Sequence, residues 1–457
     1  MPPSKSKADL SSLSTQELLE EFAAELARRR AAQAPEEDMS TMELALETET
    51  EALKRASLAR RLEQRGNEED DSPKPCPRCG ELVAVKVKKR PRQVRTLSGL
   101  QELRRNYHYC KACQVGFHPL DAALGLPEGG EVTREVERRI LDFGVNDTFS
   151  EAAQRWEVHY GWSISENLVR RVVERVGQMQ EECEPEALQE ELQPVPQQAP
   201  TLVAVGVDGS MLPTRGEDTW REAKVAVVSR EEVVEDRREG PPEQGQARYV
   251  AAVGSPEELK GELAAALAAH GANEAQRVVW LGDGAAWVWK LAEQLSPQAI
   301  QVLDWRHAQK YVADCGKALF GETDASLAVW RNTAEMLLWR GETEVLLREL
   351  EACLFLCNTA EEKEAIMTLK RYCSNNAQRM QYATFREAGL PVGSGMVESA
   401  HRHVLQQRMK RAGQHWAPAR AHRMARLRAA YRTAGPKHFH GAIYAAAARS
   451  AASASSS

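Results

Sequence analysis

The stretch TLVAVGVDG (residues 201–209) is an apolar run of strand length that ends in an aspartate followed by a glycine. A second run, RVVWLGDG (277–284), ends in the same way at Asp283. Apolar runs of this length are typical of strands buried on both faces, and open α/β sheets bind ligands at the carboxyl ends of their strands. If the two strands are neighbours, the carboxylates of Asp208 and Asp283 face each other.

The sequence around these runs predicts an α/β core with a helical segment after it. Three more strands are expected at 223–229, 247–254 and 299–307, with a capped helix over 255–271. No GxGxxG or P-loop motif accompanies them. The expected parts are a core over 201–307, a helical segment over 308–388, C-terminal helices over 389–435 and a disordered low-complexity tail over 436–457.

Carboxylates at neighbouring strand ends suggest a metal site. Glu398, near the start of the expected final helix, could supply a third acid beside Asp208 and Asp283. Such oxygen clusters suit Mg²⁺ or Mn²⁺, and two such ions support phosphodiester chemistry. Each aspartate could equally be a plain turn residue, and Asp304, also near a strand end, is a rival ligand to Asp283.

Two cysteine pairs lie ahead of the core, in CPRC and CKAC. Four thiolates at this spacing close a tetrahedral structural zinc site and leave no position for water, whereas a redox CxxC motif would be a single pair beside a βαβ unit. The five other cysteines are scattered, which argues against a disulfide framework. The sequence therefore predicts a zinc ribbon over 76–120, with the ligands Cys76, Cys79, Cys110 and Cys113.

Basic residues in the ribbon are candidates for phosphate contacts. Between Lys86 and Arg105 there are eight basic residues and one acid. Lys88, Lys89 and Arg90 would lie on the loop of the ribbon, where they could contact phosphates or be simply solvated.

The segments that flank the ribbon read as helical. Residues 1–75 combine charged helices and a polar linker, which suggests an arm for helix packing or dimerisation. Within 121–182, two helices are separated by a turn around Gly161 and a capping serine, the outline of a helix-turn-helix or of any helical hairpin. The acidic, Pro- and Gln-rich stretch 183–200 is predicted to be an interdomain linker.

Charge is unevenly distributed along the chain. From Ser399 to Ser457 there are eleven Lys and Arg and no Asp or Glu, so a net charge of −6 leaves −17 for the rest. This segregation favours a protein that binds a polyanion over a set of solvated helix faces. No apolar run of about 18 residues and no apolar signal-peptide core is present, so we expect a cytoplasmic, nucleoid-associated protein that does not enter a membrane.

Several motifs together resemble the DDE transposases of bacterial insertion sequences, closest to the Kra-type group. The resemblance covers about residues 76–432. It implies a ribonuclease H-like catalytic core with a helical insertion and a catalytic triad of Asp208, Asp283 and Glu398. The matching stretches are VGVDGS (205–210), WREAKVAVV (220–228), LGDGAAWVW (281–289), LDWRHAQKYV (303–312), GSGMVESAHRHVLQQRMKRAGQHW (393–416) and the ribbon itself.

The resemblance also suggests roles for residues near the acids. Asp304 and His307 match a D-x-x-H motif of related transposases, with a supporting role favoured, and His307 could position a phosphate or a flipped base or brace its strand. Lys224 would contact backbone phosphate, or serve as an edge-strand charge. The basic residues after Glu398 would neutralise phosphates along the DNA, namely Arg408, Lys410 and Arg411.

The expected protein is therefore a transposase that binds double-stranded DNA at element ends, cleaves it, and transfers 3′-OH ends to target DNA. Joining two ends implies a homodimer or a larger assembly. Two alternatives remain open. One is a ribonuclease H-like nuclease or resolvase that cuts without joining, and the other is a non-catalytic zinc-ribbon DNA-binding regulator.

Overall fold

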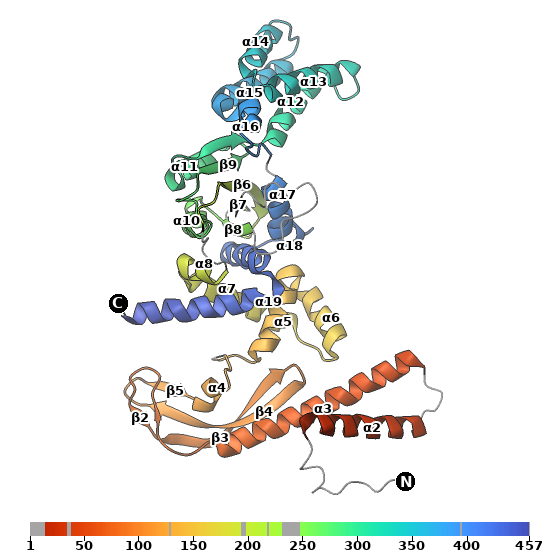
Figure 1. The fold of residues 1–457 in the computed structure, drawn as a ribbon, viewed down its shortest axis with the longest axis vertical. Helices are drawn as coiled ribbons and strands as arrows, with labels where there is room; N and C mark the ends of the chain where they lie inside the picture. The colour runs from red at the N-terminus through yellow and green to blue at the C-terminus, as the bar shows by residue number, and fades with distance from the viewer. Residues whose placement is uncertain are drawn as a thin grey trace. The chain divides into compact units, whose positions relative to one another are not determined.

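The computed structural model describes residues 14–33, 38–127, 129–192, 198–216, 219–230, 247–393 and 395–456. The chain divides into two compact units, Met1–Val136 and Glu137–Ser457 (Figure 1). No helix among these described residues is long and apolar enough to cross a membrane.

The first unit joins a helical hairpin to a small antiparallel sheet. The hairpin consists of α2 (Thr15–Gln33) and α3 (Met39–Glu68), and Asp38 caps α3 by accepting a hydrogen bond from the backbone of Thr41. The end of α3 packs against β4 (Gly99–Cys110). A Cβ atom at Gly66 would lie 2.6 Å from the carbonyl oxygen of Arg104, so only glycine permits this approach.

The ribbon region is built on two strands of 12 residues each. β4 pairs with β3 (Val85–Thr96) on one side and with β5 (Val115–Phe117) on the other. Along the first half of β4, buried and exposed side chains alternate, as expected for a strand with one covered face. A second ladder joins β1 (Lys74–Pro75) to β2 (Leu82–Val83), and α4 (Pro119–Ala123) follows β5.

The second unit contains five strands where the sequence predicted them, but the fifth ends at Leu303 and not at residue 307. Asp304 caps a helix that begins at Trp305, so His307 lies in this helix and does not brace a strand. The five strands form one mixed sheet in the order β10-β9-β6-β7-β8, with β6, β7 and β8 antiparallel and β9 parallel to both β6 and β10. The first and fourth strands are neighbours, which was the condition for Asp208 and Asp283 to face each other. The strands are β6 (Leu202–Pro213), β7 (Trp220–Arg230), β8 (Ala247–Val253), β9 (Arg277–Gly282) and β10 (Ile300–Leu303).

Helices cover this sheet and extend the core. Val205 of β6 and Trp280 of β9 are fully buried in a core that reaches into the helical segment after β10. That segment is helical throughout, as predicted. It consists of α12 (Trp305–Phe320), α13 (Ala325–Trp339), α14 (Thr343–Leu354), α15 (Ala360–Asn376), η2 (Ala377–Met380) and α16 (Tyr382–Glu387). Two further helices precede β10, namely α10 (Glu257–Ala269) after β8 and α11 (Ala286–Leu295) after β9.

The predicted pair of helices around Gly161 is present, within a group of three helices. A capping box at Thr148 opens α6 (Phe149–Tyr160), and Gly161 closes it in the left-handed conformation, with φ 67°. Ser165 caps α7 (Glu166–Glu182). The apolar face of α7 packs against α19 (Pro418–Ser456), so this face belongs to the core of the unit. The third helix is α5 (Arg134–Asn146).

Two segments expected to lack structure are helical. Residues 185–192 of the expected linker form α8 (Pro185–Leu192), which buries Leu188 against neighbouring helices. The expected disordered tail continues α19 beyond a kink at Gly435, and Phe439 and Ile443 are fully buried. In both cases a few apolar side chains at helical spacing have a surface to pack on, which composition did not reveal. Residues 193–197 and 457 lie outside the described residues.

Candidate functional site

Asp208 and Asp283 meet at the carboxyl end of β9. The expectation that Asp208 ends its strand is wrong, because β6 continues to Pro213. Asp208 lies within β6, and Asp283 directly follows β9, the parallel neighbour of β6. A ligand atom of His307, from the first turns of α12, joins them, and the three atoms all lie within 4.8 Å of one another. The structure thus brings together three predicted site residues in a cluster that could hold a metal ion.

Asp304 fixes the orientation of the His307 ring by a hydrogen bond to that ring. Asp304 is completely buried and caps α12 by accepting a hydrogen bond from the backbone of Arg306, at 3.2 Å. Its other oxygen lies 2.8 Å from Nδ1 of His307. Since this bond occupies Nδ1, the other ring nitrogen, Nε2, is left for an ion. Asp304 itself is not part of the three-residue cluster.

The surroundings of the cluster raise the pKa values of Asp208 and His307. Burial, opposed by the Gly209 backbone N–H and reinforced by the charge of Asp283, raises the pKa of Asp208 to about 6. The hydrogen bond to Asp304, opposed by burial, raises the pKa of His307. Two partly buried acids held close together favour a cation between them.

Glu398, the predicted third acid, lies outside this cluster. It is an exposed residue of α17 (Gly395–Ala400), a short helix that packs on β6 and β7. The side chain of its neighbour Val397 rests against Gly206, where an added Cβ atom would be only 3.1 Å away. Because Gly206 and Asp208 project from the same face of β6, α17 covers the face that carries Asp208.

Three basic residues C-terminal to Glu398 were predicted to neutralise DNA phosphates, and of these Lys410 lies beside the cluster. It follows π-helical residues His401–Gln406 and α18 (Gln407–Met409), and its Nζ donates to the hydroxyl of Ser210 at 2.6 Å. Burial lowers the pKa of Lys410, although the charge of Asp208 acts in the opposite direction. Ser210 is on the same face of β6 as Asp208, so an ammonium group lies next to the acids.

The other predicted cations are satisfied within the protein. Lys224 is buried, donates to Glu222 and to the Gly254 carbonyl at 2.6 Å each, and lies over a tryptophan ring. Arg408 is 1% exposed and lies over two aromatic rings, and burial lowers its pKa to about 10. Arg411 pairs with Glu151. Neither Lys224 nor Arg408 presents its charge to a surface phosphate.

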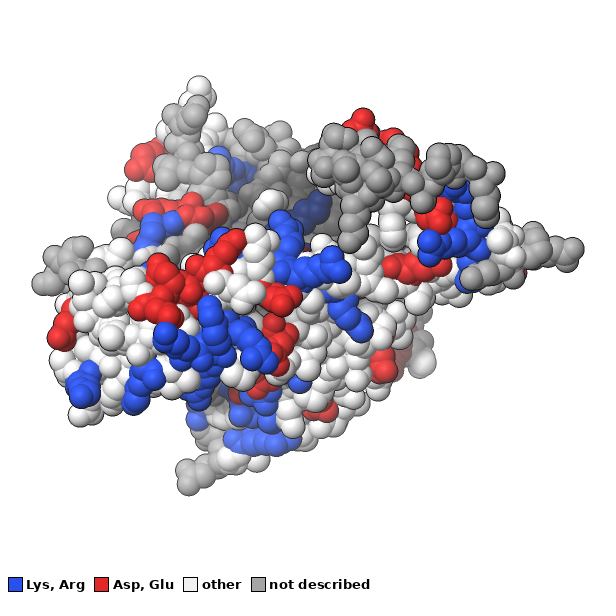
Figure 2. All heavy atoms as spheres, turned by 90° about the horizontal axis from the view of Figure 1, so that it is seen from below, with Lys and Arg blue, Asp and Glu red and all other residues white. Residues whose placement is uncertain are grey.

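The ribbon cations also have local partners. Lys88 pairs with Asp71 at 2.5 Å, Lys89 donates to the carbonyl group of Gly66, and Arg90 lies over the ring of Tyr107. Figure 2 shows Lys and Arg interspersed with Asp and Glu on the face it presents. Lys88, Lys89 and Arg90 all lie in β3 and not on a loop as expected, and within the described residues only Lys88 of the three is paired with an acid.

The four paired cysteines form a second candidate metal centre, in the first unit. Their sulfur atoms all lie within 4.8 Å of one another, and those of Cys79 and Cys110 are 3.8 Å apart. A tetrahedral ion with bonds of about 2.3 Å would place its sulfur ligands about 3.8 Å apart. Backbone N–H groups of Arg78 and Cys79 lower the pKa of Cys76 to about 7, which favours a thiolate, whereas burial and the neighbouring sulfurs raise the pKa values of Cys110 and Cys113. The cluster could therefore hold a metal ion.

The helical segment contributes residues that the sequence did not identify. The hydroxyl of Tyr372, from α15, donates to the backbone carbonyl of Asp283 at 2.9 Å, and its ring stacks on Tyr311 at 3.7 Å between centroids. An open polar cleft of about 710 Å³ begins beside Asp283. It is lined in part by Lys290, Arg371 and Arg379. No motif marks these residues, because the fold brings them in from distant positions.

The fold and site define an α/β protein with two candidate metal centres, one in each unit. Residues 81–440 match the model of the uncharacterised protein family UPF0236. The chain belongs to this family. The match includes Asp208, Asp283, His307 and Glu398, and it begins just after Cys76 and Cys79. No curated protein matches the chain.

Proposed function

We propose that the chain is a DDE-type DNA transposase with a ribonuclease H-like core, which cleaves phosphodiester bonds at element ends and transfers 3′-OH ends to target DNA. The observation that carries the proposal is the meeting of Asp208, Asp283 and His307 at the carboxyl end of β9. The sheet, in which three antiparallel strands are joined by two parallel ones in the order β10-β9-β6-β7-β8, supports the proposed core.

The donor set of this cluster fits Mg²⁺ or Mn²⁺. Carboxylate oxygens suit both ions, and an imidazole nitrogen is more usual for Mn²⁺. A divalent cation held there would polarise a phosphate oxygen and lower the pKa of a bound water. Asp304 would keep His307 in one tautomer and orientation, which makes it a positioning residue.

Glu398 is proposed as the third acid of the site. Its helix rests on the face of β6 that carries Asp208, and its side chain is exposed. Exposure leaves the carboxylate able to turn towards substrate, whereas the buried Val397 beside it anchors the helix.

The charges around the acids suit a nucleic-acid strand. Lys410 lies next to Asp208, and the cleft beside Asp283 carries Lys290, Arg371 and Arg379. These cations would neutralise phosphates on either side of the scissile bond, with affinity that falls as salt rises. The four-cysteine centre fits zinc in a structural role, since four protein ligands leave no position for water.

A cleavage assay tests this function. Purified protein is incubated with Mg²⁺ or Mn²⁺ and DNA from the two edges of the element that encodes it. We expect cleavage at the ends, which Asp283→Asn lowers by about 100-fold or more while DNA binding persists. Asp314→Asn, at an exposed acid of α12, is the matched control. Full cleavage by Asp283→Asn would remove the basis of the proposal.

A nuclease that cuts without joining is the second candidate. One observation favours it, namely that the three-residue cluster is assembled without Glu398. Pre-cleaved ends with a free 3′-OH separate the two functions. Joined product supports the transposase, whereas cleavage without any joining supports the nuclease. DNA binding without either activity would instead indicate a regulator.

A further inference from the structure

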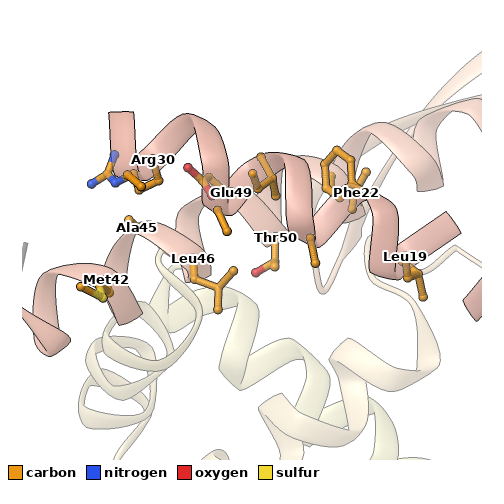
Figure 3. A pocket seen from close by; sticks show the side chains of 13 residues that line it. Leu19, Phe22, Arg30, Met42, Ala45, Leu46, Glu49 and Thr50 are labelled. Carbon is orange, nitrogen blue, oxygen red and sulfur yellow. The ribbon is translucent and has the colours of Figure 1, made fainter. Parts of the chain in front are cut away.

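Two of the open cavities differ in character. In the first unit, α2 and α3 form an apolar groove whose lining includes Leu19, Phe22 and Leu46 (Figure 3). Nothing in the described part of the chain shows what covers this groove. In the second unit, the polar cleft beside Asp283 is lined in part by Tyr372, whose hydroxyl is hydrogen-bonded to the backbone of Asp283. The cleft therefore contains a residue that contacts the candidate metal site.

The three residues of the candidate metal cluster come from separate elements, so contacts between these elements must set their spacing. Asp208 lies in β6 and Asp283 follows β9, whereas His307 lies in α12. Both ladders of β9 end before Asp283. One oxygen of the Asp283 side chain accepts a hydrogen bond from the backbone of Ala285 at 2.9 Å, which is a contact within the same turn. Strand pairing therefore does not fix the backbone at Asp283.

Tyr372 of α15 contacts the backbone of this turn in two ways. Its hydroxyl donates to the carbonyl group of Asp283 at 2.9 Å. Its ring packs against Gly284, where φ is 103° and an added Cβ atom would lie 3.0 Å from Cε2 of the ring. Glycine adopts this φ readily and leaves room for the ring. The turn after β9 is thus shaped to receive Tyr372.

The same ring contacts the helix that carries His307. Tyr372 stacks on Tyr311 of α12, with 3.7 Å between the ring centroids and 11° between the ring planes. His307 and Tyr311 are one helical turn apart in the sequence, so they project from the same face of α12. The two helices α12 and α15 pack against each other (Figure 1). Tyr372 therefore contacts both the turn of Asp283 and the face of α12 that carries His307.

Tyr372 is itself held in place by contacts near the end of α15. The side-chain amide of Asn376, which is 4% exposed, donates to the backbone carbonyl group of Tyr372 at 3.0 Å. Arg379 of η2 donates to the side chain of Gln301 in β10 at 2.7 Å. Since β10 leads directly into Asp304, this bond joins the end of α15 to the strand ahead of α12.

Burial alone does not explain the hydrogen bond of Tyr372. A buried tyrosine usually finds a partner for its hydroxyl. Tyr382 is fully buried in the same helical segment, yet its hydroxyl has no hydrogen-bond partner among the described residues. The packing of this segment therefore accepts a tyrosine without a hydrogen bond, and Tyr382 offers a matched comparison.

We propose that Tyr372 is a positioning residue of the candidate metal site, which sets the separation of Asp283 and His307 by contacting the elements that carry both. The inference rests on the metal site of the proposed function, but it needs neither cleavage nor strand transfer. A chain that binds Mn²⁺ through Asp283 and cuts no DNA would remove the transposase and leave the role of Tyr372 standing.

Mn²⁺ titration of the full chain, followed by electron paramagnetic resonance, tests the hydroxyl. Tyr372→Phe keeps the stacked ring and removes the donor, whereas Tyr382→Phe removes a hydroxyl that has no partner among the described residues. We expect the Mn²⁺ Kd to rise by about 10-fold or more for Tyr372→Phe and to stay unchanged for Tyr382→Phe. Asp283→Asn identifies which bound ion occupies the cluster.

A spectroscopic signature tests the link to His307, because a merely structural role would not change it. A ring nitrogen bound to Mn²⁺ modulates the electron spin echo of the ion. Tyr372→Leu removes the hydroxyl and the stack on Tyr311, so we expect this nitrogen signal to weaken while circular dichroism shows a folded chain.

Three results would overturn the proposal. The first is a wild-type Mn²⁺ affinity in Tyr372→Phe, and the second is an unchanged nitrogen signal in Tyr372→Leu. The third is an equal loss of affinity in Tyr382→Phe, because the loss would then reflect the packing of the helical segment as a whole. A wild-type chain without any bound Mn²⁺ that Asp283→Asn removes would overturn the proposal and also the metal site of the proposed function.

Discussion

At the residue scale, the candidate site depends on two acids with different roles, the fully buried Asp304 and the partly buried Asp208. One carboxylate oxygen of Asp304 accepts a hydrogen bond at the start of α12, and the other is hydrogen-bonded to His307. Asp208 accepts a hydrogen bond from the Gly209 backbone N–H at 2.8 Å, which offsets only part of the cost of its burial. Hydrogen bonds therefore offset the cost of burying Asp304. They offset only part of that cost for Asp208, whose carboxylate a cation would stabilise.

Asp208→Asn should stabilise the metal-free protein at neutral pH. A carboxyl whose folded-state pKa is raised from 3.8 to about 6 favours its protonated form on folding, so its cost is absent below pH 4, grows between pH 4 and 6, and is constant above. The full shift corresponds to about 3 kcal/mol. Chemical denaturation should show a higher free energy of unfolding for the variant at pH 7.5 and little difference at pH 4.

Saturating Mn²⁺ should reverse this order, because an ion that binds only the folded wild-type protein stabilises it by mass action. A variant as strongly stabilised by Mn²⁺ as the wild type would show that Asp208 is not a ligand.

Asp304→Asn should weaken the hydrogen bond that orients His307, while all three residues of the metal cluster remain in place. The hydrogen bond raises the pKa of His307, so the variant should lower that pKa, as measured by the NMR titration of its ring protons. Mn²⁺ affinity should fall by about 10- to 100-fold. An unchanged His307 titration would contradict the positioning role, whatever happens to metal affinity.

The linked effect of His307 on stability has a definite sign. Because the folded-state pKa is raised, the pair stabilises the protein fully below the unfolded pKa of His307, and this contribution is lost as the pH rises through the folded value. Asp304→Asn should remove that pH dependence.

At the scale of elements, the sequence predicted what short-range patterns determine. The apolar runs around Asp208 and Asp283 predicted the strands but left their adjacency open, and the turn at Gly161 predicted α6 and α7. Patterns failed where tertiary packing decides. The Ala- and Ser-rich end of α19 is ordered because a few apolar side chains find a surface. Tyr372 reaches the site from 89 residues away, which no local motif can indicate.

Phe439→Ala tests the ordered end of α19. The ring is fully buried and packs edge-on against Tyr431 at 5.0 Å between centroids. Removing a buried phenylalanine ring costs about 3–5 kcal/mol, so we expect a loss of this size in the free energy of unfolding. Lys437→Ala, at an exposed position two residues earlier, should change it by less than about 0.5 kcal/mol. Equal free energies of unfolding for the two variants would support the expectation from the sequence that the tail is disordered.

At the scale of the whole molecule, the two candidate metal centres belong to separate units. The cysteine cluster joins β4 to the turn after β1, and the acidic cluster joins β6, β9 and α12. Each unit has buried apolar residues of its own, such as Val94 and Leu103 in the first and Val205 in the second. The chemistry of the two centres differs as well, because thiolates favour zinc and carboxylates favour Mg²⁺ or Mn²⁺.

Replacing Cys76 and Cys79 by serine should therefore affect the first unit alone. Losing two thiolates abolishes tight zinc binding, and a small sheet closed by metal loses much of its stability. Elemental analysis should show loss of stoichiometric zinc, and calorimetry should show a lower unfolding temperature for one transition only. Mn²⁺ binding at the Asp208 cluster should be unchanged. Cys353→Ser with Cys357→Ser, outside the cluster, is the matched control. Full zinc retention, or a parallel loss of Mn²⁺ binding, would contradict the assignment of independent centres.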